Sequence, residues 1–442
     1  MPHSKSLFSF AVFFFFLIAI HNSNAQTIER SSDAQRISKA RDAVLPVVVS
    51  ILTVRQDYQQ GEPVLSVSSG SGTVISAQGH IATNAHVTQN GKSFRIVFFD
   101  GRELPAKLIG TDTASDLAVL QAIPPSPEIF PFAKFAENLD GLTPGDTVLA
   151  MGAPWGLSNS MSAGVVNNPR RLLVSLFDDE ADYEDRLGVD EPTGRYYAWI
   201  QHDAAIAPGN SGGPLVDLNG RIVGVNTRGM IVGGDLAFAI PGPDVASVVK
   251  RLIADGKIQR VALGFRLRSL KGTRYTEGVL VNAIERRSQA DKAGLQAGDR
   301  IVSLNGDVVT ALQPVDVPAL QRRIAELPIG SQVVLKIERS AKVIEVKLKA
   351  DAQPKSRGDD LASSPFGISV TELTQPMGRR RHLDDDAGLL ITGIRPGGAG
   401  AIARPKLLAG DIIRKIDSQV VNETSQFSNI VVPANSEKYY LF

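Results

Sequence analysis

A single serine stands at the centre of a glycine-rich stretch, Gly209-Asn-Ser211-Gly-Gly213. A hydroxyl that attacks a carbonyl group must be exposed, and backbone N–H groups must point at the oxygen that becomes negative. Flanking glycines allow both arrangements. The same residue types are also common in ordinary β-turns. The stretch alone therefore leaves two alternatives open, a serine nucleophile and a plain turn.

A serine is a weak nucleophile until a base removes its proton. His86 follows Thr83-Asn-Ala and closes an apolar segment that begins at Val74. The other five histidines lie in the N-terminal segment or in polar, turn-like surroundings: His3, His21, His80, His202 and His382. A lone histidine at a strand end is more often structural than catalytic, so the choice of His86 depends on its partners.

The base in turn needs an acid that orients its imidazole. Asp116 opens the apolar stretch Leu117–Leu120, where a carboxylate would be partly buried. Asp112 is the nearby competitor, but Gly110-Thr-Asp is more typical of a turn. We therefore predict Asp116, His86 and Ser211 as acid, base and nucleophile. Along an all-β chain, the order His, Asp, Ser is the chymotrypsin order.

Short β-branched runs separated by turn residues extend from about residue 43 to residue 250, which predicts an all-β sandwich or barrel. Helical periodicity is scarce there before Pro243–Ala254. The clearest predicted strands are Val47–Val54, Gly72–Ser76, Arg95–Phe99, Leu117–Gln121, Thr147–Met151 and Ile222–Asn226.

Beyond Lys257 the chain repeats itself, which predicts two homologous modules over residues 258–350 and 364–442. Each copy opens with apolar-Gly-apolar and later carries an Ala-Gly-Asp run, at Ala297 and at Ala409. The polar residues 351–363 between the copies predict a linker. The second copy has less chain after its Gly-Asp pair, so we expect it to be incomplete or to close differently.

The composition excludes several classes of function. Lys and Arg total 47 against 46 Asp and Glu, so a net charge of +1 gives no electrostatic reason to bind nucleic acid. The absence of cysteine excludes disulfides, thiolate metal sites and a cysteine nucleophile. We expect neither a metal nor an organic cofactor.

The N-terminus predicts export. A weakly basic start precedes the apolar run Leu7–Ile20, and Ser23 and Ala25 are small residues at the spacing that a signal peptidase reads. The run is short for a membrane span. We interpret residues 1–25 as a cleaved signal peptide leading to the periplasm; an uncleaved anchor is the alternative.

Taken together, these motifs resemble those of the HtrA/Deg serine proteases over nearly all of residues 41–440. The resemblance implies a mainly β fold, with a chymotrypsin-like double β-barrel over residues 41–257 after a short segment, 26–40. Two PDZ-like α+β domains would follow. The matching runs include Gly70–Ile75, Thr83–Val87, Ser115–Ala118, Met151–Gly156, Gln201–Ala205, Gly209–Leu215 and Phe238–Pro241.

The resemblance also implies roles for further residues. The N–H groups of Gly209 and Ser211 would form the oxyanion hole. Ala205, with Met230 and Ile231, would form a pocket for small or medium apolar side chains. The PDZ loops would bind peptide C-terminal carboxylates through backbone N–H groups. Those loops contain Leu263, Gly264 and Phe265 in the first module and Phe366, Gly367 and Ile368 in the second.

Residues 168–197 are unusually acidic. In the family this region is a regulatory loop that senses ligands through an arginine, and Arg171 occupies that place. The alternative is a solvated surface loop. The resemblance also implies a homotrimer.

Three functions remain open from the sequence. The leading one is ATP-independent proteolysis of unfolded or damaged extracytoplasmic proteins, with PDZ domains that capture exposed C-termini. The others are a chaperone or binding protein that holds clients without cutting them, and a regulatory protease with one dedicated substrate.

Overall fold

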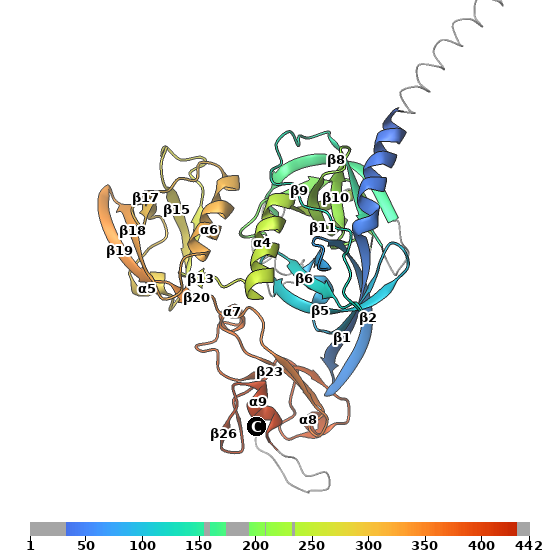
Figure 1. Ribbon diagram of the computed structural model, residues 1–442. Coiled ribbons are helices and arrows are strands. Elements are labelled where there is room, and N and C mark those ends of the chain that lie inside the picture. Colours follow the sequence, from blue (N-terminus) through green and yellow to red (C-terminus); the bar gives the residue numbers. More distant parts are fainter. Residues whose placement is uncertain (1–31, 154–159, 174–193, 208, 232–234, 431–442) are drawn as a thin grey trace, which may run out of the picture.

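The structure is a computed structural model, and it describes residues 32–153, 160–173, 194–207, 209–231 and 235–430. The predicted signal peptide lies outside these residues. Two β-barrels are followed by two smaller modules (Figure 1). None of the described helices is long and apolar enough to cross a membrane. The predicted mainly β fold class is confirmed.

The first barrel follows a helix over residues 32–44 and a 3-10 turn, η1 (Leu45–Val47). Its elements are β1 (Val48–Gln59), β2 (Glu62–Val74), β3 (His80–Thr83), α2 (Ala85–Thr88), β4 (Gly91–Val97), β5 (Glu103–Asp112) and β6 (Leu117–Ala122). The strands close in the order β1-β2-β3-β6-β5-β4. Fully buried Ile51, Ile81 and Leu120 fill the interior, as expected for a small barrel packed with side chains.

The second barrel repeats this design with strands in the order β10-β11-β12-β9-β8-β7. Those strands are β7 (Thr147–Gly152), β8 (Ser160–Arg171), β9 (Trp199–His202), β10 (Pro214–Asp217), β11 (Ile222–Ile231) and β12 (Asp235–Pro241). Leu149 and Phe238 share one buried cluster with the side chains of the first barrel. The two barrels therefore form a single packed body.

Helix α4 (Gly242–Asp255) packs against strands of both barrels. Its buried residues Val245, Val248, Val249 and Leu252 recur every three or four positions, which places them on one face. Gly256 ends the helix in the left-handed conformation, with φ of +71°, and its N–H donates to the carbonyl of Leu252. These features explain why the helix predicted over 243–254 forms almost where expected.

The first module has its own buried core, in which Leu335 and Ile337 are fully buried. Its main sheet has the order β14-β15-β16-β18-β19, so β14 lies at an edge. The elements are β13 (Val261–Ala262), β14 (Phe265–Arg268), β15 (Val279–Ile284), α5 (Gln289–Lys292), β16 (Arg300–Leu304), β17 (Asp307–Val308), η4 (Pro314–Asp316), α6 (Val317–Ala325), β18 (Gln332–Arg339), β19 (Lys342–Lys349) and β20 (Asp351–Ala352).

The second module has a four-stranded sheet of order β21-β22-β23-β24 and a separate two-stranded ribbon. Residues 431–442, which we expected to close it, lie outside the described residues. Its elements are β21 (Asp360–Ser363), β22 (Ile368–Glu372), α7 (Gln375–Arg380), β23 (Leu389–Ile394), α8 (Ala399–Ile402), β24 (Ile412–Ile413), β25 (Lys415–Ile416), β26 (Gln419–Val420) and α9 (Thr424–Ser428).

The interval 351–363, predicted as a linker without regular structure, contains β20 and β21. Each of these short strands pairs with a strand of a module, β20 with β13 and β21 with β22. The backbone hydrogen bonds of these pairs stabilise polar residues that show no strand pattern in the sequence.

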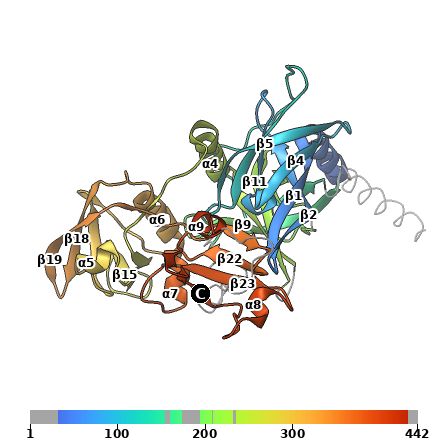
Figure 2. The same ribbon diagram turned by 90° about the horizontal axis from the view of Figure 1, so that it is seen from below.

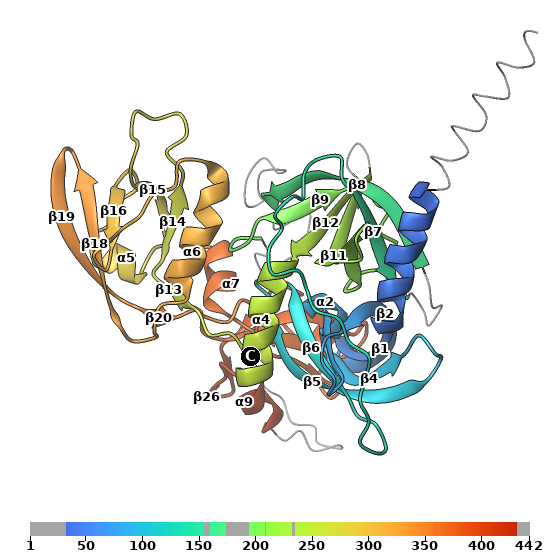
Figure 3. The same cartoon turned by 45° about the horizontal axis from the view of Figure 1, so that its top comes forward.

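The modules contact different parts of the barrels. The first lies beside α4, with α6 facing it (Figures 1 and 3). The second lies against the β1–β2 hairpin, seen best from below in Figure 2. At the hairpin tip, Gly61 donates its N–H to the hydroxyl of Ser369 at 2.9 Å.

Candidate active site

The site begins with a carboxylate and an imidazole in direct contact. Nδ1 of His86 lies 2.9 Å from Oδ2 and 3.0 Å from Oδ1 of Asp116. The Asp116 carboxylate also accepts the backbone N–H of His86 at 3.1 Å. The carboxylate side chain is 3% exposed and the imidazole 33% exposed. Asp116 therefore holds Nδ1 of the ring, while part of the imidazole remains exposed.

Asp116 occupies a turn just before β6, with a φ of +55° that non-glycine residues rarely adopt. Thr227 of β11 donates its hydroxyl to Asp116 Oδ2 at 2.5 Å. Burial acts to raise the pKa of Asp116. The charges of His86 and Arg228 and the hydrogen bonds from His86 and Thr227 outweigh it, so the net pKa is lowered. Asp116 is thus held ionised against the imidazole.

The glycine-rich stretch forms a tight turn between the two barrels. Gly212 has a φ of +87°, and a Cβ there would lie 2.2 Å from the carbonyl oxygen of Ser71. A Cβ on Gly213 would lie 2.1 Å from the carbonyl oxygen of Met151. Only glycine fits this approach of backbone to backbone. The N–H of Ser71 donates to the carbonyl of Ser211 at 2.8 Å, which ties the turn to β2.

Gly209, at the start of this turn, has a φ of +102°. Its carbonyl accepts a hydrogen bond from the Ser71 hydroxyl at 2.5 Å. That carbonyl is therefore fixed on the side of the first barrel. Residue 208, which directly precedes Gly209, lies outside the described residues.

The hydroxyl of Ser211 donates to the backbone carbonyl of Thr227 at 2.8 Å. Thr227 thus contacts both Asp116 through its side chain and Ser211 through its main chain. In the described part of the chain the serine hydroxyl has this partner rather than the imidazole. A rotation about the Cα–Cβ bond of Ser211 would redirect it.

The chain matches two domain families, the trypsin-like peptidase domain over residues 70–225 and the PDZ domain over residues 261–350. It is 34% identical to a probable periplasmic serine endoprotease DegP-like of Bartonella henselae, over 85% of this chain and 72% of that protein. A protein of the same name from Chlamydia trachomatis is 32% identical, over 84% and 71% of the two chains. This chain belongs to the DegP-like serine endoproteases of the HtrA type.

Solved structures agree with this membership. The HtrA-type protease AlgW with tripeptide is 27% identical, with a TM-score of 0.59, and the match covers 72% of this chain and 97% of that one. The serine endoprotease from Yersinia pestis is 26% identical, with a TM-score of 0.53 and the same coverage.

In this DegP-like protease three residues have surroundings that the sequence did not predict. His86 lies in the short helix α2, not at a strand end, because a break after Thr83 turns the chain. Asp112, predicted to lie in a turn, is the last residue of β5; it is buried and paired with Arg260, whose Nη2 lies 2.8 Å from Oδ2. His202 is fully buried at the end of β9, and burial lowers its pKa to about 4.

Thr227 and Ser71 are site residues that sequence reasoning missed. Ser71 lies in the family-like run Gly70–Ile75, but that run assigns it no role. Thr227 directly follows the predicted strand Ile222–Asn226, where a hydroxyl indicates nothing specific. Arg260 was missed for a different reason: its partner Asp112 is 148 positions earlier in the chain.

The residues predicted for the substrate pocket and the regulatory loop are only partly described. Ala205 is exposed, and its carbonyl accepts a hydrogen bond from Ser162 at 2.7 Å. Met230 and Ile231 belong to β11, but their side chains lie outside the described residues. Arg171 donates to the Gln201 side chain at 2.7 Å. The acidic stretch 178–191 also lies outside the described residues.

The first predicted PDZ loop borders a small cavity of about 80 Å³. The carbonyls of Leu263 and Gly264 accept N–H groups from Ala290 and Glu285, at 2.9 and 2.8 Å. The cavity is also lined by Phe265, Gln321 and Ile324 of the module and by Arg195 and Tyr196 of the protease domain.

The second predicted loop is held in the same way. The carbonyls of Phe366 and Gly367 accept N–H groups from Gly400 and Arg395, at 2.8 and 2.7 Å. The loop containing Ile368 therefore matches the first in its backbone contacts.

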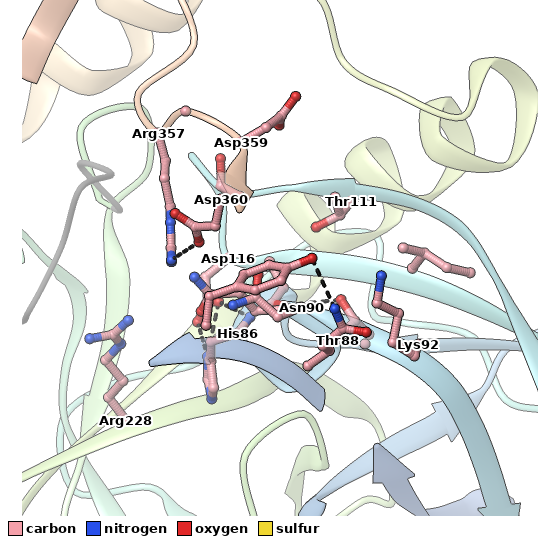
Figure 4. Close-up of a pocket in the computed structure, with 18 residues that line it drawn as sticks. His86, Thr88, Asn90, Lys92, Thr111, Asp116, Arg228, Arg357, Asp359 and Asp360 are labelled. Carbon is pink, nitrogen blue, oxygen red and sulfur yellow. Dashed lines mark hydrogen bonds and ion pairs between the residues drawn. The ribbon is translucent and has the colours of Figure 1, made fainter. Parts of the chain in front are cut away.

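A larger cavity of about 640 Å³ opens beside the imidazole (Figure 4). His86, Asp116 and Arg228 line one part of it, and residues 357–360 between the two modules line another. Figure 4 shows Arg357 and Asp360 directed toward each other above His86 and Asp116. This cavity could receive a polypeptide segment next to the His–Asp pair.

Proposed function

We propose that Ser211 is the nucleophile, His86 the general base and Asp116 the orienting acid of this endopeptidase. The observation that carries the assignment is the His86–Asp116 contact within the protease domain, with Ser211 joined to the same site through Thr227. Because Asp116 fixes Nδ1, the other ring nitrogen, Nε2, is available to the serine proton.

In the first half-reaction, the Ser211 oxygen attacks the peptide carbonyl carbon while its proton moves to Nε2 of His86. The N–H groups of Gly209 and Ser211 stabilise the resulting oxyanion. Collapse of the tetrahedral intermediate breaks the C–N bond, and His86 returns the proton to the leaving amine. Water then hydrolyses the acyl-enzyme with His86 again as base. Each step uses groups of this chain and needs no nucleotide.

The proposed substrates are unfolded or damaged proteins outside the cytoplasm. An unfolded chain can lie extended across the site beside His86, whereas a folded one cannot. Alanine at position 205, with Met230 and Ile231, favours small or medium apolar side chains at the cleaved bond. The first PDZ loop supports capture of exposed C-termini, which raises the local substrate concentration.

The same proposal includes export through residues 1–25 and assembly as a homotrimer, both inferred from family resemblance. Periplasmic extraction of the chain with and without residues 1–25 tests export, and light scattering of the purified protein tests the trimer.

Digestion of reduced casein tests the proposed activity. We expect the protein to degrade casein without added ATP, and Ser211→Ala to leave the substrate intact. Equal degradation by both proteins would contradict the assignment of Ser211.

A further inference from the structure

The two PDZ modules differ at the edge where a peptide would bind. A PDZ ligand adds as an extra strand beside the strand that follows the apolar-Gly-apolar loop. In the first module that strand is β14, which pairs only with β15 and has one free edge among the described residues. In the second module it is β22, which pairs with β23 on one side and β21 on the other.

We propose that β21 is an intramolecular ligand of the second PDZ module and occupies the edge of β22 in place of a peptide. Four successive residue pairs, from Asp360 with Thr371 to Ser363 with Ile368, form an antiparallel ladder. The N–H of Gly367 donates to the carbonyl of Ser363 at 2.8 Å, which closes the hairpin. The backbone groups that a peptide would use on this edge face the protein's own chain.

Side-chain packing supports the same arrangement. Leu361 of β21 packs into the cluster formed by Phe366, Ile368 and Phe427. The rings of Phe366 and Phe427 lie 5.8 Å apart. Helix α9 contacts both β21 and β22, so it covers the strand as a PDZ helix would cover a ligand. Leu361 therefore fills the apolar position that a peptide side chain would otherwise take.

The loop of the second module is covered as well. Gly61, at the tip of the β1–β2 hairpin, packs so closely on it that a Cβ there would lie 2.7 Å from the backbone of Gly367 and Ile368. Glu62 pairs with Arg395 beside the loop. The second module thus contacts the protease domain through the loop that corresponds to the predicted peptide-binding loop of the first module.

This arrangement places residues 357–360 in the wall of the cavity beside His86. These residues immediately precede or begin β21, so the pairing of β21 holds them there. A competing ligand that displaced β21 would also move this wall. This inference about the second module rests on the proposed function in one respect: it assumes that the competing ligand is a peptide with a free C-terminus.

Cysteine cross-linking tests the pairing without any ligand, because the chain has no native cysteine. The probe is the full chain with Ser211→Ala, Ala362→Cys and Ser369→Cys, two positions that are directly paired. Mild oxidation should give a nearly complete intramolecular disulfide. The control pair Asp360→Cys and Ser369→Cys is diagonal, roughly 7–8 Å apart, and should cross-link several-fold more slowly. Equal, slow cross-linking of both pairs would overturn the proposal.

Counting peptide sites tests the occlusion. The probe is a fluorescent peptide with an apolar C-terminal residue and a free carboxylate, titrated into the full chain carrying Ser211→Ala. Leu361→Asp should expel β21 and add one site per chain, whereas Leu361→Val should add none. Two peptide sites per chain in the protein with Leu361 intact would overturn the proposal. So would an unchanged number of sites in Leu361→Asp.

The two proposals fail separately in this titration. If the first module does not bind peptides, the chain with Leu361 intact binds none, yet Leu361→Asp should still add one. The amidated peptide, which lacks the carboxylate, should not bind at the added site.

Discussion

At the scale of single residues, Thr227 connects the two halves of the site. Its hydroxyl donates to Asp116 and its carbonyl accepts the hydroxyl of Ser211. A hydrogen bond to a buried carboxylate is worth about 1.5–3 kcal/mol. Loss of the Thr227 hydroxyl should therefore weaken the orientation of Asp116 without removing a reacting group.

We predict that Thr227→Val lowers kcat at least about 10-fold, since ~1.4 kcal/mol corresponds to one factor of ten. Thr227→Ser retains the hydroxyl and should stay within about twofold of the original kcat. Peptide hydrolysis under saturating substrate provides the measurement. Equal activity of the valine and serine variants would show that this hydrogen bond does not orient Asp116.

A stronger effect is expected at Asp116 itself. Asparagine keeps the shape of the side chain but cannot stabilise the imidazolium or fix the tautomer of His86. In a serine protease of this type the equivalent change lowers kcat about 10⁴-fold. We predict a loss of that order for Asp116→Asn, measured with the same peptide. A loss below 10-fold would contradict the role of Asp116.

The buried imidazole of His202 makes stability depend on pH. Burial lowers its pKa to about 4 from the ordinary value of 6.5, so the folded chain stays unprotonated where the unfolded chain binds a proton. Stability should therefore fall as pH falls from about 6.5 to about 4. At pH 5 this effect should make the free energy of unfolding about 2 kcal/mol lower than at pH 8.

Urea unfolding of the Ser211→Ala protein at pH 8 and pH 5 provides the test. His202→Leu has no proton to bind, so its free energy of unfolding should decrease by about 2 kcal/mol less than that of the protein with His202. If both decrease equally, His202 is not the group responsible.

Motif spacing predicted that His86, Asp116 and Ser211 share one site. The structure places His86 against Asp116, and Thr227 contacts both Asp116 and Ser211. Sequence reasoning could not assign Asp112 or His202, because burial depends on what packs over a residue. Asp112 is enclosed by Arg260, and His202 by the second barrel. Polar residues in short runs give no sign of such burial.

At the scale of elements, the ion pair between Asp112 and Arg260 joins β5 to the segment that enters the first PDZ module. The two side chains are 4% and 5% exposed. Ser115, next to Asp116, also donates to Asp112, at 2.5 Å. The pair therefore connects the module entrance to the turn that carries Asp116.

We predict that Asp112→Ala destabilises the protein by about 3–5 kcal/mol, because it leaves the Arg260 charge buried without a partner. Combining it with Arg260→Met should restore part of that loss, which a double-mutant cycle in urea would measure. Strict additivity of the two changes would contradict the coupling.

Element positions were predicted better where apolar residues dominate. The strand expected at Thr147–Met151 and the helix expected at Pro243–Ala254 end within one residue of β7 and α4. The strand expected at Gly72–Ser76 overlaps only the last three residues of β2, which runs from Glu62 to Val74. The earlier part of β2 is mostly exposed, so hydrophobic alternation gave no indication that backbone pairing with β1 extends it.

At the scale of the whole molecule, contact with the β1–β2 hairpin joins the second module to the first barrel. Gly61→Val should break that contact, since its φ is +82° and a Cβ would meet the backbone of Gly367. We predict a larger radius of gyration in X-ray scattering and faster proteolytic cleavage near residues 353–359.

Gly101→Val is the matched control, because Gly101 has a φ of +83° with nothing within 4 Å of a Cβ. It imposes similar backbone strain without a steric clash. If both variants expand the molecule equally, strain rather than docking is responsible. The sequence could not predict this contact, because residues 61 and 367 share no local pattern.

The proposed activity depends on Ser211 as a nucleophile that His86 activates. Labelling with a fluorophosphonate followed by peptide mass mapping tests it most directly. We expect a single label on Ser211, absent in Ser211→Ala and formed at least about 100-fold more slowly in His86→Ala. A label on another residue, or labelling of His86→Ala at an unchanged rate, would contradict it.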